Sequence, residues 1–136
     1  LLPENQEKKV VIHRDYRFQG KVHCNLGQLN QVFMNLLTNA LQSIHGEGEI
    51  WVRTEQKGDE ILITIEDNGQ GIPPEVLPRI FEPFYTTKEV GEGTGLGMAI
   101  SFGIIEQHQG NIDVISEPGK GSEFIISLPL RLSNSK

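Results

Sequence analysis

The sequence predicts an α/β (α+β) fold, a two-layer sandwich in which a mixed sheet of about five strands is covered by three helices on one face. Several runs are rich in β-branched residues, and two longer stretches repeat apolar residues with helical spacing. Strands follow one another with helices inserted, instead of alternating strictly with them. With 136 residues and 37% hydrophobic residues, the chain can form one core. We expect a single domain over residues 1–136, with residues 1–7 ending an upstream linker or helix and residues 131–136 forming a tail.

The composition excludes several classes of protein. A formal net charge of −6 argues against a nucleic-acid partner, which would favour a basic face. There is no apolar run of membrane-spanning length and no signal peptide, so we expect no direct membrane contact. The single cysteine, Cys24, excludes an internal disulfide and fits a reducing cytoplasm. The chain opens at Leu1 without an initiator methionine, so we expect a fragment of a longer protein. We expect this domain to be cytoplasmic and monomeric, and its parent protein can be anchored in a membrane.

The first elements are a strand and a long helix. Residues 8–14 are rich in β-branched side chains and predict a strand, and residues 21–24 are a candidate for a short second one. Residues 26–44 predict an amphipathic helix, because apolar side chains recur three and four positions apart. Gly46 and Gly48 end that pattern.

The remaining elements are strands, a short turn of helix and a second long helix. Gly58 and Asp59 separate two β-rich runs, residues 49–57 and 60–67, as in a two-residue hairpin. Two prolines open a helical turn at residues 74–80. A second helix is predicted from residue 96 to about residue 109, with Gly110 as its C-cap. A closing hairpin joins residues 111–117 to residues 122–130.

The first long helix carries amides where surface helices usually carry charges. It has no Lys, Arg, Asp or Glu, and its polar side chains are spaced as one stripe: Gln28, Gln31, Asn35, Asn39 and Gln42. Amides offer an oxygen to a hard cation and an NH₂ group to an anion. The alternative is a neutral interface with another helix.

Asp67 ends an apolar strand face. It continues the period-two series of Ile61, Ile63 and Ile65, and it begins the pattern Asp-x-Gly-x-Gly. A carboxylate at the end of an apolar slot would accept a hydrogen bond from an exocyclic amine such as that of adenine, and the glycines would let a flat ligand approach the backbone. A plain turn is the alternative.

A glycine-rich loop leads into the second long helix. Gly93, Gly95 and Gly97 would present free backbone N–H groups at a helix N-terminus, which is an anion site, and Lys88 lies on the same loop. The pattern is neither a Walker A motif nor a dinucleotide fingerprint. The alternative is a flexible loop followed by a capped helix.

Taken in order, these motifs resemble the catalytic ATP-binding domain of sensor histidine kinases. The series is Asn35-x-x-x-Asn39, Asp67-x-Gly69-x-Gly71, Phe81-x-x-Phe84 and Gly93-x-Gly95-x-Gly97. Such domains have the Bergerat fold, which they share with DNA gyrase B subunits, MutL and heat-shock chaperone ATPases. The resemblance extends over residues 8–130. It implies ATP and Mg²⁺ as cofactors.

The resemblance implies a role for each matching residue. Asn39 would coordinate Mg²⁺, and Asn35 would assist at the metal or the phosphates. Asp67 would accept from the adenine amine, with Ser122 supporting it through water. Lys88 and Asn35 are the implied catalytic residues. The remaining implied nucleotide contacts are Gly69, Gly71, Ile72, Phe81, Tyr85, Gly93, Thr94, Gly95, Leu96 and Gly97.

One position bears on the reaction. Hydrolysing relatives carry a glutamate that activates water where this chain has Asn35, and an amide is no general base at neutral pH. The site is therefore expected to hold ATP without hydrolysing it rapidly, as suits a kinase that transfers the γ-phosphoryl group.

The phosphoacceptor histidine is absent. His13, His23, His45 and His108 all lack the sequence surroundings of an acceptor helix. The implied partners are therefore a histidine-bearing dimerisation domain of the same parent protein and the receiver domain of a response regulator. The alternatives are a Bergerat-type ATPase, a serine kinase of the anti-sigma type, or a non-catalytic nucleotide-binding module.

Overall fold

The molecule is built on one mixed five-stranded sheet, seen in a computed structural model that describes residues 8–82 and 97–130. The strands are β1 (Lys9–Tyr16), β2 (Glu47–Lys57), β3 (Glu60–Asp67), β4 (Asn111–Glu117) and β5 (Gly121–Pro129). They lie in the order β1-β2-β3-β5-β4. β1 runs parallel to β2, and the other neighbouring pairs are antiparallel. The predicted fold class is confirmed, and β3 is the central strand.

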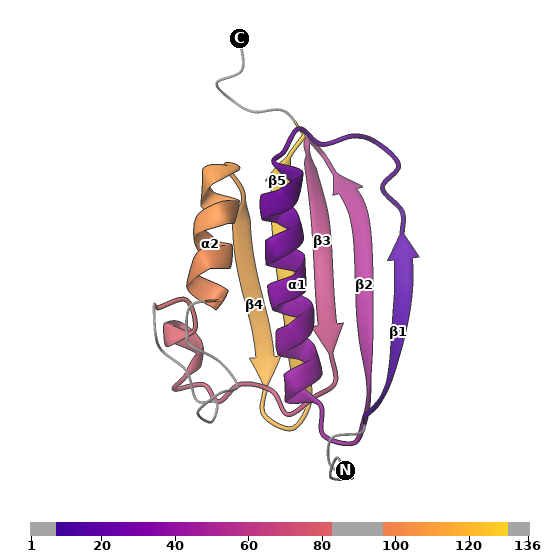
Figure 1. Ribbon diagram of the computed structural model, residues 1–136, viewed down its shortest axis with the longest axis vertical. Coiled ribbons are helices and arrows are strands. Elements are labelled where there is room, and N and C mark those ends of the chain that lie inside the picture. Colours follow the sequence, from indigo (N-terminus) through magenta and orange to yellow (C-terminus); the bar gives the residue numbers. More distant parts are fainter. Residues whose placement is uncertain (1–7, 83–96, 131–136) are drawn as a thin grey trace.

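Two α-helices cover one face of this sheet. α1 (Leu26–Ser43) lies against β3 and β5, and α2 (Gly97–Gln107) lies beside it against β4 (Figure 1). The prediction of three covering helices was wrong for the described residues. The expected turn of helix at residues 74–80 is reduced to a single 3-10 turn, η2 (Leu77–Arg79), where Pro78 offers no backbone N–H group to an extended helix. None of the described helices is long and apolar enough to cross a bilayer.

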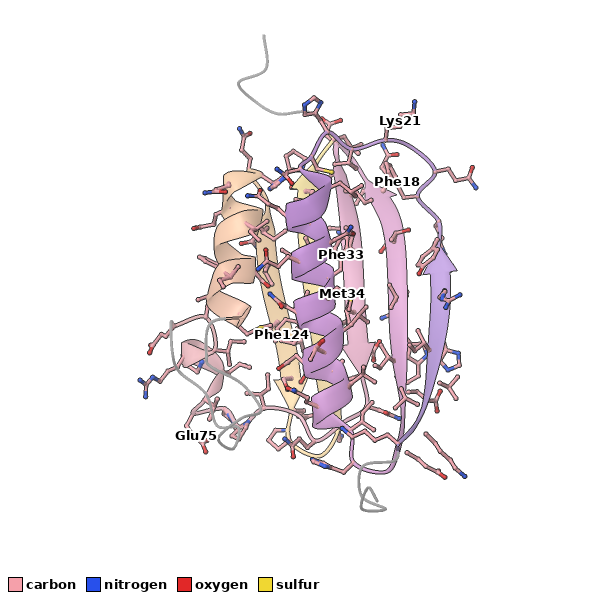
Figure 2. The ribbon with its side chains drawn as sticks, viewed as in Figure 1. Phe18, Lys21, Phe33, Met34, Glu75 and Phe124 are labelled. Carbon is pink, nitrogen blue, oxygen red and sulfur yellow. The ribbon has the colours of Figure 1, made fainter. Side chains whose placement is uncertain are left out.

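α1 forms because its apolar stripe faces the sheet and its ends are capped. The side chains it buries are Leu29, Val32, Leu36 and Ala40. The Asn25 side chain accepts a hydrogen bond from the Gln28 N–H group at 3.0 Å, which satisfies a free donor of the first turn. On the outer side, Met34 is 60% exposed, whereas Phe124 of β5 is buried between the layers (Figure 2).

The β2–β3 hairpin was predicted correctly, and the short strand at residues 21–24 was not. Lys57 pairs with Glu60 across the turn, where Gly58 has a φ of +62°. Residues 17–25 contain no strand; Val22 and Cys24 pack against the core from an irregular segment.

The end of α2 differs from the predicted cap. Gln109, not Gly110, adopts the left-handed conformation, with a φ of +62°. The Gly110 N–H group donates to Ile105 O at 2.9 Å. A Cβ atom on Gly110 would lie 2.3 Å from Ser127 O, so this glycine is required by its close approach to β5.

Candidate nucleotide site

The predicted site residues that the structure describes gather at one end of the sheet. β3 and β4 end there and β5 begins there. The first turn of α2 and the last turns of α1 cover the sheet at this end (Figure 1). Glu75 marks this end of the molecule and Lys21 the opposite end (Figure 2). The predicted site residues that fall outside the described part of the chain are Tyr85, Lys88, Gly93, Thr94, Gly95 and Leu96.

Asp67 is the buried centre of this end. It is the last residue of β3 and lies between Ile50 of β2 and Ser122 of β5 in the sheet. Its side chain continues the inner face of β3 and is only 4% exposed. Its Oδ1 atom accepts hydrogen bonds from the Gly69 N–H group at 2.8 Å and from the Ser43 hydroxyl at 3.0 Å.

Burial dominates the electrostatics of Asp67. Desolvation raises the pKa of its carboxyl above the ordinary value. The hydrogen bonds from Gly69 and Ser43, together with the backbone of Ser122, act in the opposite direction without cancelling that rise. None of the ion pairs among the described residues involves Asp67. A carboxyl group buried without a cation is costly, so its position calls for a functional explanation.

The loop after Asp67 is fixed on both sides by hydrogen bonds. On the α1 side, the Gln70 N–H group donates to Ser43 O at 2.9 Å. On the β4–β5 side, Gly119 N–H donates to Gln70 O at 2.8 Å, and Ile72 N–H donates to Ser116 Oγ at 2.8 Å. The loop is therefore a rigid bridge between helix and hairpin.

The glycines of this loop are explained by packing of the chain itself. A Cβ atom on Gly69 would lie 2.2 Å from Ser43 Oγ. On Gly71, which has a φ of +78°, it would lie 2.1 Å from Glu117 O. Both positions exclude any side chain because backbone and helix end approach so closely. The sequence interpretation had assigned these glycines to the approach of a purine.

Asn35 joins the two helices. Its Nδ2 atom donates to Gly97 O at 3.2 Å and to Ser101 Oγ at 3.1 Å, so the amide of α1 is bonded to the first turns of α2. Ser101 is fully buried. Asn39 lies one turn further along α1 and is half-buried. Asn35, the middle residue of the amide stripe, thus faces α2.

The other described site residues line the same end. The Phe81 ring packs on Phe102 of α2 with centroids 5.2 Å apart. Ile72 packs against the core. Ser122 is buried, and its hydroxyl forms a 2.8 Å hydrogen bond with Ser116 Oγ.

Three serines were missed from the sequence. Ser43 follows Asn35 and Asn39 at the same four-residue spacing, and that spacing could have identified it. Ser116 follows Ile112 and Val114 on the inner face of β4, which the period of two could have revealed. Ser101 carries no comparable signal, because a lone serine in an apolar helix is common.

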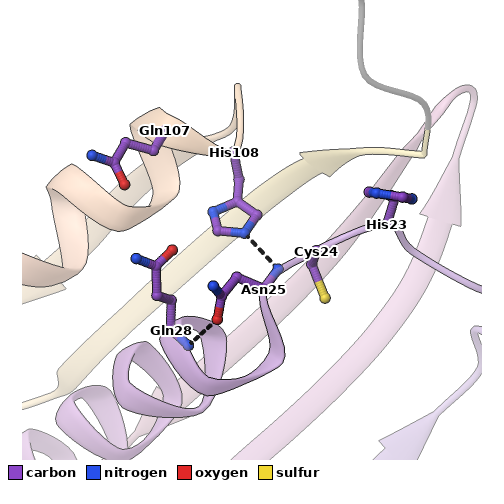
Figure 3. A pocket seen from close by; sticks show the side chains of 6 residues that line it. All are labelled: His23, Cys24, Asn25, Gln28, Gln107 and His108. Carbon is purple, nitrogen blue, oxygen red and sulfur yellow. Dashed lines mark hydrogen bonds between the residues drawn. The ribbon is translucent and has the colours of Figure 1, made fainter. Parts of the chain in front are cut away.

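Two hollows lie at opposite ends of the fold. One, of about 470 Å³, is lined by Glu66, Asp67, Ile115, Ser116, Glu117, Lys120, Gly121, Ser122 and Glu123. The other, of about 400 Å³, lies where α1 begins and α2 ends (Figure 3). In it, His108 Nε2 accepts from the Asn25 N–H group at 3.0 Å, which ties the two helix ends together. Only the first hollow includes predicted site residues.

The fold and this site define a family of ATPases. Residues 24–132 match the family of histidine kinase-, DNA gyrase B- and HSP90-like ATPases, and the chain belongs to that family. Within the family it is similar to histidine kinases. It is 48% identical over 111 residues to sporulation kinase E of Bacillus subtilis (strain 168), covering 81% of this chain and 15% of that protein.

Solved structures agree with this placement. The catalytic domain of histidine kinase ThkA superposes with a TM-score of 0.79 at 29% identity, covering 89% of this chain and 80% of that one. Full-length ShkA in complex with AMPPNP superposes with a TM-score of 0.81 at 26% identity, covering 96% of this chain and 28% of that one. Other curated relatives are named sensor kinases or sensor histidine kinases. The chain spans a small part of the curated relatives it matches.

Proposed function

We propose that this chain is the catalytic ATP-binding domain of a two-component sensor histidine kinase, acting in the cytoplasm. It would bind Mg-ATP and present the γ-phosphoryl group to a histidine on a separate dimerisation domain of its parent protein, which would pass it to a response regulator. The observation that carries the proposal is the buried Asp67 carboxyl at the end of β3, which has hydrogen-bond donors on Oδ1 and no ion pair with any residue that the structure describes.

Asp67 suits an adenine amine. An ionised carboxylate accepts hydrogen bonds only, and the exocyclic amine of adenine is a donor. An amine placed at the carboxylate would replace part of the solvation that burial removes. Hypoxanthine and guanine present an oxygen at the same position and would meet repulsion instead. The Asp67 carboxylate would therefore favour adenine nucleotides over those of hypoxanthine and guanine.

Asn35 and Asn39 suit the phosphate end of the nucleotide. The Asn39 amide oxygen is a hard donor of the kind that Mg²⁺ accepts beside phosphates and water. Bound Mg²⁺ supplies charge neutralisation to the phosphates. Asn35 already orders the first turn of α2 and cannot act as a general base. Transfer without rapid hydrolysis is consistent with an amide at this position.

Binding of Mg-ADP and Mg-ATP by isothermal titration tests the proposal. We expect saturable binding by the wild-type domain and a loss of at least about tenfold in affinity for Asp67→Asn, since a charge-assisted hydrogen bond is lost. Asp113→Asn, an exposed carboxyl on β4, is the matched control and is expected to bind normally. Normal binding by Asp67→Asn would refute the assignment of the adenine site.

Transfer of phosphate separates the kinase from its alternatives. Radioactive ATP is expected to label the dimerisation domain of the parent protein when the two domains are mixed, with negligible labelling of this domain alone. Fast hydrolysis by the isolated domain would instead identify a Bergerat-type ATPase. Binding without transfer to any added histidine domain would identify a nucleotide-sensing module, and strong self-labelling would contradict the absence of an acceptor.

A further inference from the structure

We propose that Ser43 is a positioning residue that aims the Asp67 carboxylate at the adenine amine and thereby sets the base selectivity of the site. This inference rests on the proposed function, because it deepens the role of Asp67 in nucleotide binding. It concerns a side chain outside the motifs that predicted the site. It is carried by three features of the contact between the last turn of α1 and the end of β3.

The first feature is that two of the hydrogen bonds to the carboxyl, one from α1 and one from the loop after Asp67, end on the same oxygen, while a third comes from the backbone of Ser122. Ser43 Oγ and the Gly69 N–H group both lie within 3.0 Å of Asp67 Oδ1, and neither of them bonds to Oδ2. One donor comes from the helix and the other from the loop. Two donors on one oxygen restrict rotation about the terminal bond of the side chain, which is otherwise soft. Oδ2 is then held in a constant direction.

The second feature is that the Ser43 hydroxyl has only one hydrogen and two acceptors. Ala40 O lies 2.9 Å from Ser43 Oγ, and Asp67 Oδ1 lies 3.0 Å from it. A hydroxyl donates one hydrogen bond, so the two acceptors compete for it. A charged acceptor forms the stronger bond. The hydroxyl therefore turns to Asp67 when the carboxyl is ionised, which is the state that accepts from an amine.

The third feature is that the hydroxyl cannot move away. The backbone carbonyl of Ser43 accepts from the Gln70 N–H group at 2.9 Å. The missing side chain of Gly69 leaves room for Ser43 Oγ, since a Cβ atom on Gly69 would lie 2.2 Å from it. The serine, the loop and the carboxylate form one closed contact, and a site held in this way is preorganised for its ligand.

The selectivity between ADP and IDP tests this role. IDP carries an oxygen in place of the amine, so its affinity should not benefit from an aimed carboxylate. We expect wild-type protein to prefer ADP, and Ser43→Ala to lose about fivefold or more of this preference, mainly through weaker ADP binding. Ser43→Thr retains the hydroxyl and should retain the preference. Ser127→Ala, which removes a serine from the opposite face of the sheet, should leave both affinities unchanged.

The outcomes separate this inference from the proposed function. Equal weakening of ADP and IDP in Ser43→Ala would mean a structural role only and would overturn the inference. An unchanged preference in Ser43→Ala, with the preference still abolished by Asp67→Asn, would overturn the inference and leave the adenine site intact. Wild-type protein that binds neither nucleotide would refute both. Should Ser43→Ala not fold, Ser43→Cys, which has a weaker donor of similar size, must show the same loss.

Discussion

Asp67 is an ionisable side chain that the fold buries among isoleucines. Ile65 precedes it on the same face of β3 and is 2% exposed, so the carboxyl lies at the buried end of an apolar strand face. Burial raises its pKa because the charged form loses water that the hydrogen bonds from Gly69, Ser43 and Ser122 replace only in part. A residue placed this way reduces the stability of the empty domain at neutral pH, as is common at binding sites.

The pH dependence of stability should reveal this penalty. Because the folded pKa lies above the unfolded one, the contribution of Asp67 is most favourable at acid pH, where the carboxyl is protonated in both states. It is lost as pH rises through the folded pKa. Without nucleotide, Asp67→Asn should therefore gain stability relative to wild type between acid and neutral pH. Urea unfolding over that range measures it, with Asp113→Asn as the control; a deficit in Asp67→Asn that grows toward neutral pH would contradict the argument.

The sequence predicted Asp67 and the amides, but not the residues that hold them. Asp67 was identifiable because a carboxylate interrupts a period-two apolar series. Ser43 of α1, which donates to Asp67, lies 24 positions before it, and Ser116 of β4, which accepts from the Ile72 N–H group in the loop, lies 49 positions after it. Only the folded arrangement brings these segments together. Local periodicity predicts that a polar side chain lies on the inner face of its own element. It does not predict which residues of other elements that side chain will contact.

At the scale of elements, one side chain links the two helices at the site. Asn35 of α1 donates to Gly97 and Ser101 of α2. α2 begins directly after residues 83–96, which include Gly93 and Gly95, two of the predicted phosphate-binding glycines. The amide therefore determines where the first turn of α2 lies relative to α1.

Removing this link should destabilise the domain measurably. Asn35→Ala deletes two hydrogen bonds and leaves Gly97 O and the buried Ser101 hydroxyl without this donor, so we expect a loss of about 1–3 kcal/mol in the free energy of unfolding. Hydrogen exchange should accelerate at the start of α2 more than in the sheet. Asn30→Ala, an exposed amide on the same helix, should change stability by less than about 0.5 kcal/mol. Equal effects of the two variants would show that Asn35 does not couple the helices.

The β4–β5 turn offers a matched pair of glycines. Gly121 has a φ of +121°, and a Cβ atom on it would lie 2.0 Å from Asp67 O. Gly119 has a φ of +80° with open space around it. Gly119→Ala should cost about 1 kcal/mol from backbone strain alone, whereas Gly121→Ala should cost about 3 kcal/mol or more and disturb nucleotide binding, because β5 must move away from Asp67. Denaturant unfolding compares the two; similar losses would mean that the contact with Asp67 O is easily relieved.

The elements were predictable where periodicity or turn chemistry decides them. α1 and the β2–β3 hairpin have unbroken patterns and came out nearly as expected. The helical turn at residues 74–80 did not, because Pro78 lies inside it and offers no backbone N–H group to a longer helix. Gly110 was assigned a cap role that Gln109 fulfils, since nothing local shows that the chain must pass so close to β5.

At the scale of the whole molecule, the two faces of the sheet differ in what they carry. The helices cover the inner face, which holds the core and the site. The outer face carries an ion-pair network in which Arg53 meets Glu66 at 2.6 Å and Glu123 at 3.4 Å, and Trp51 stacks on His13 with ring centroids 5.4 Å apart. The candidate site residues that the structure describes gather instead at one end of the inner face.

The negative charge of the chain around the candidate site opposes the binding of nucleotide phosphates. Residues 66–123 contain ten acidic and three basic residues, a local charge of −7, and every predicted site residue except Asn35 and Asn39 lies within this stretch. α1, which faces α2, contributes amides and no cation. Phosphates entering this field meet repulsion that neutral hydrogen-bond donors offset only partly. A divalent cation bound with the nucleotide would remove most of this repulsion.

Nucleotide affinity should therefore depend strongly on Mg²⁺. We expect ADP to bind at least about tenfold more weakly when EDTA replaces Mg²⁺, because the phosphates then enter an acidic region uncompensated. Asn39→Ala should remove most of this dependence, with little effect on the affinity measured in EDTA, whereas Asn30→Ala should keep it. Titrations at matched ionic strength separate this specific effect from general screening. Equal affinities with Mg²⁺ and with EDTA would show that the groups around the phosphates compensate their charge without a metal, and would leave Asn39 without the role proposed for it.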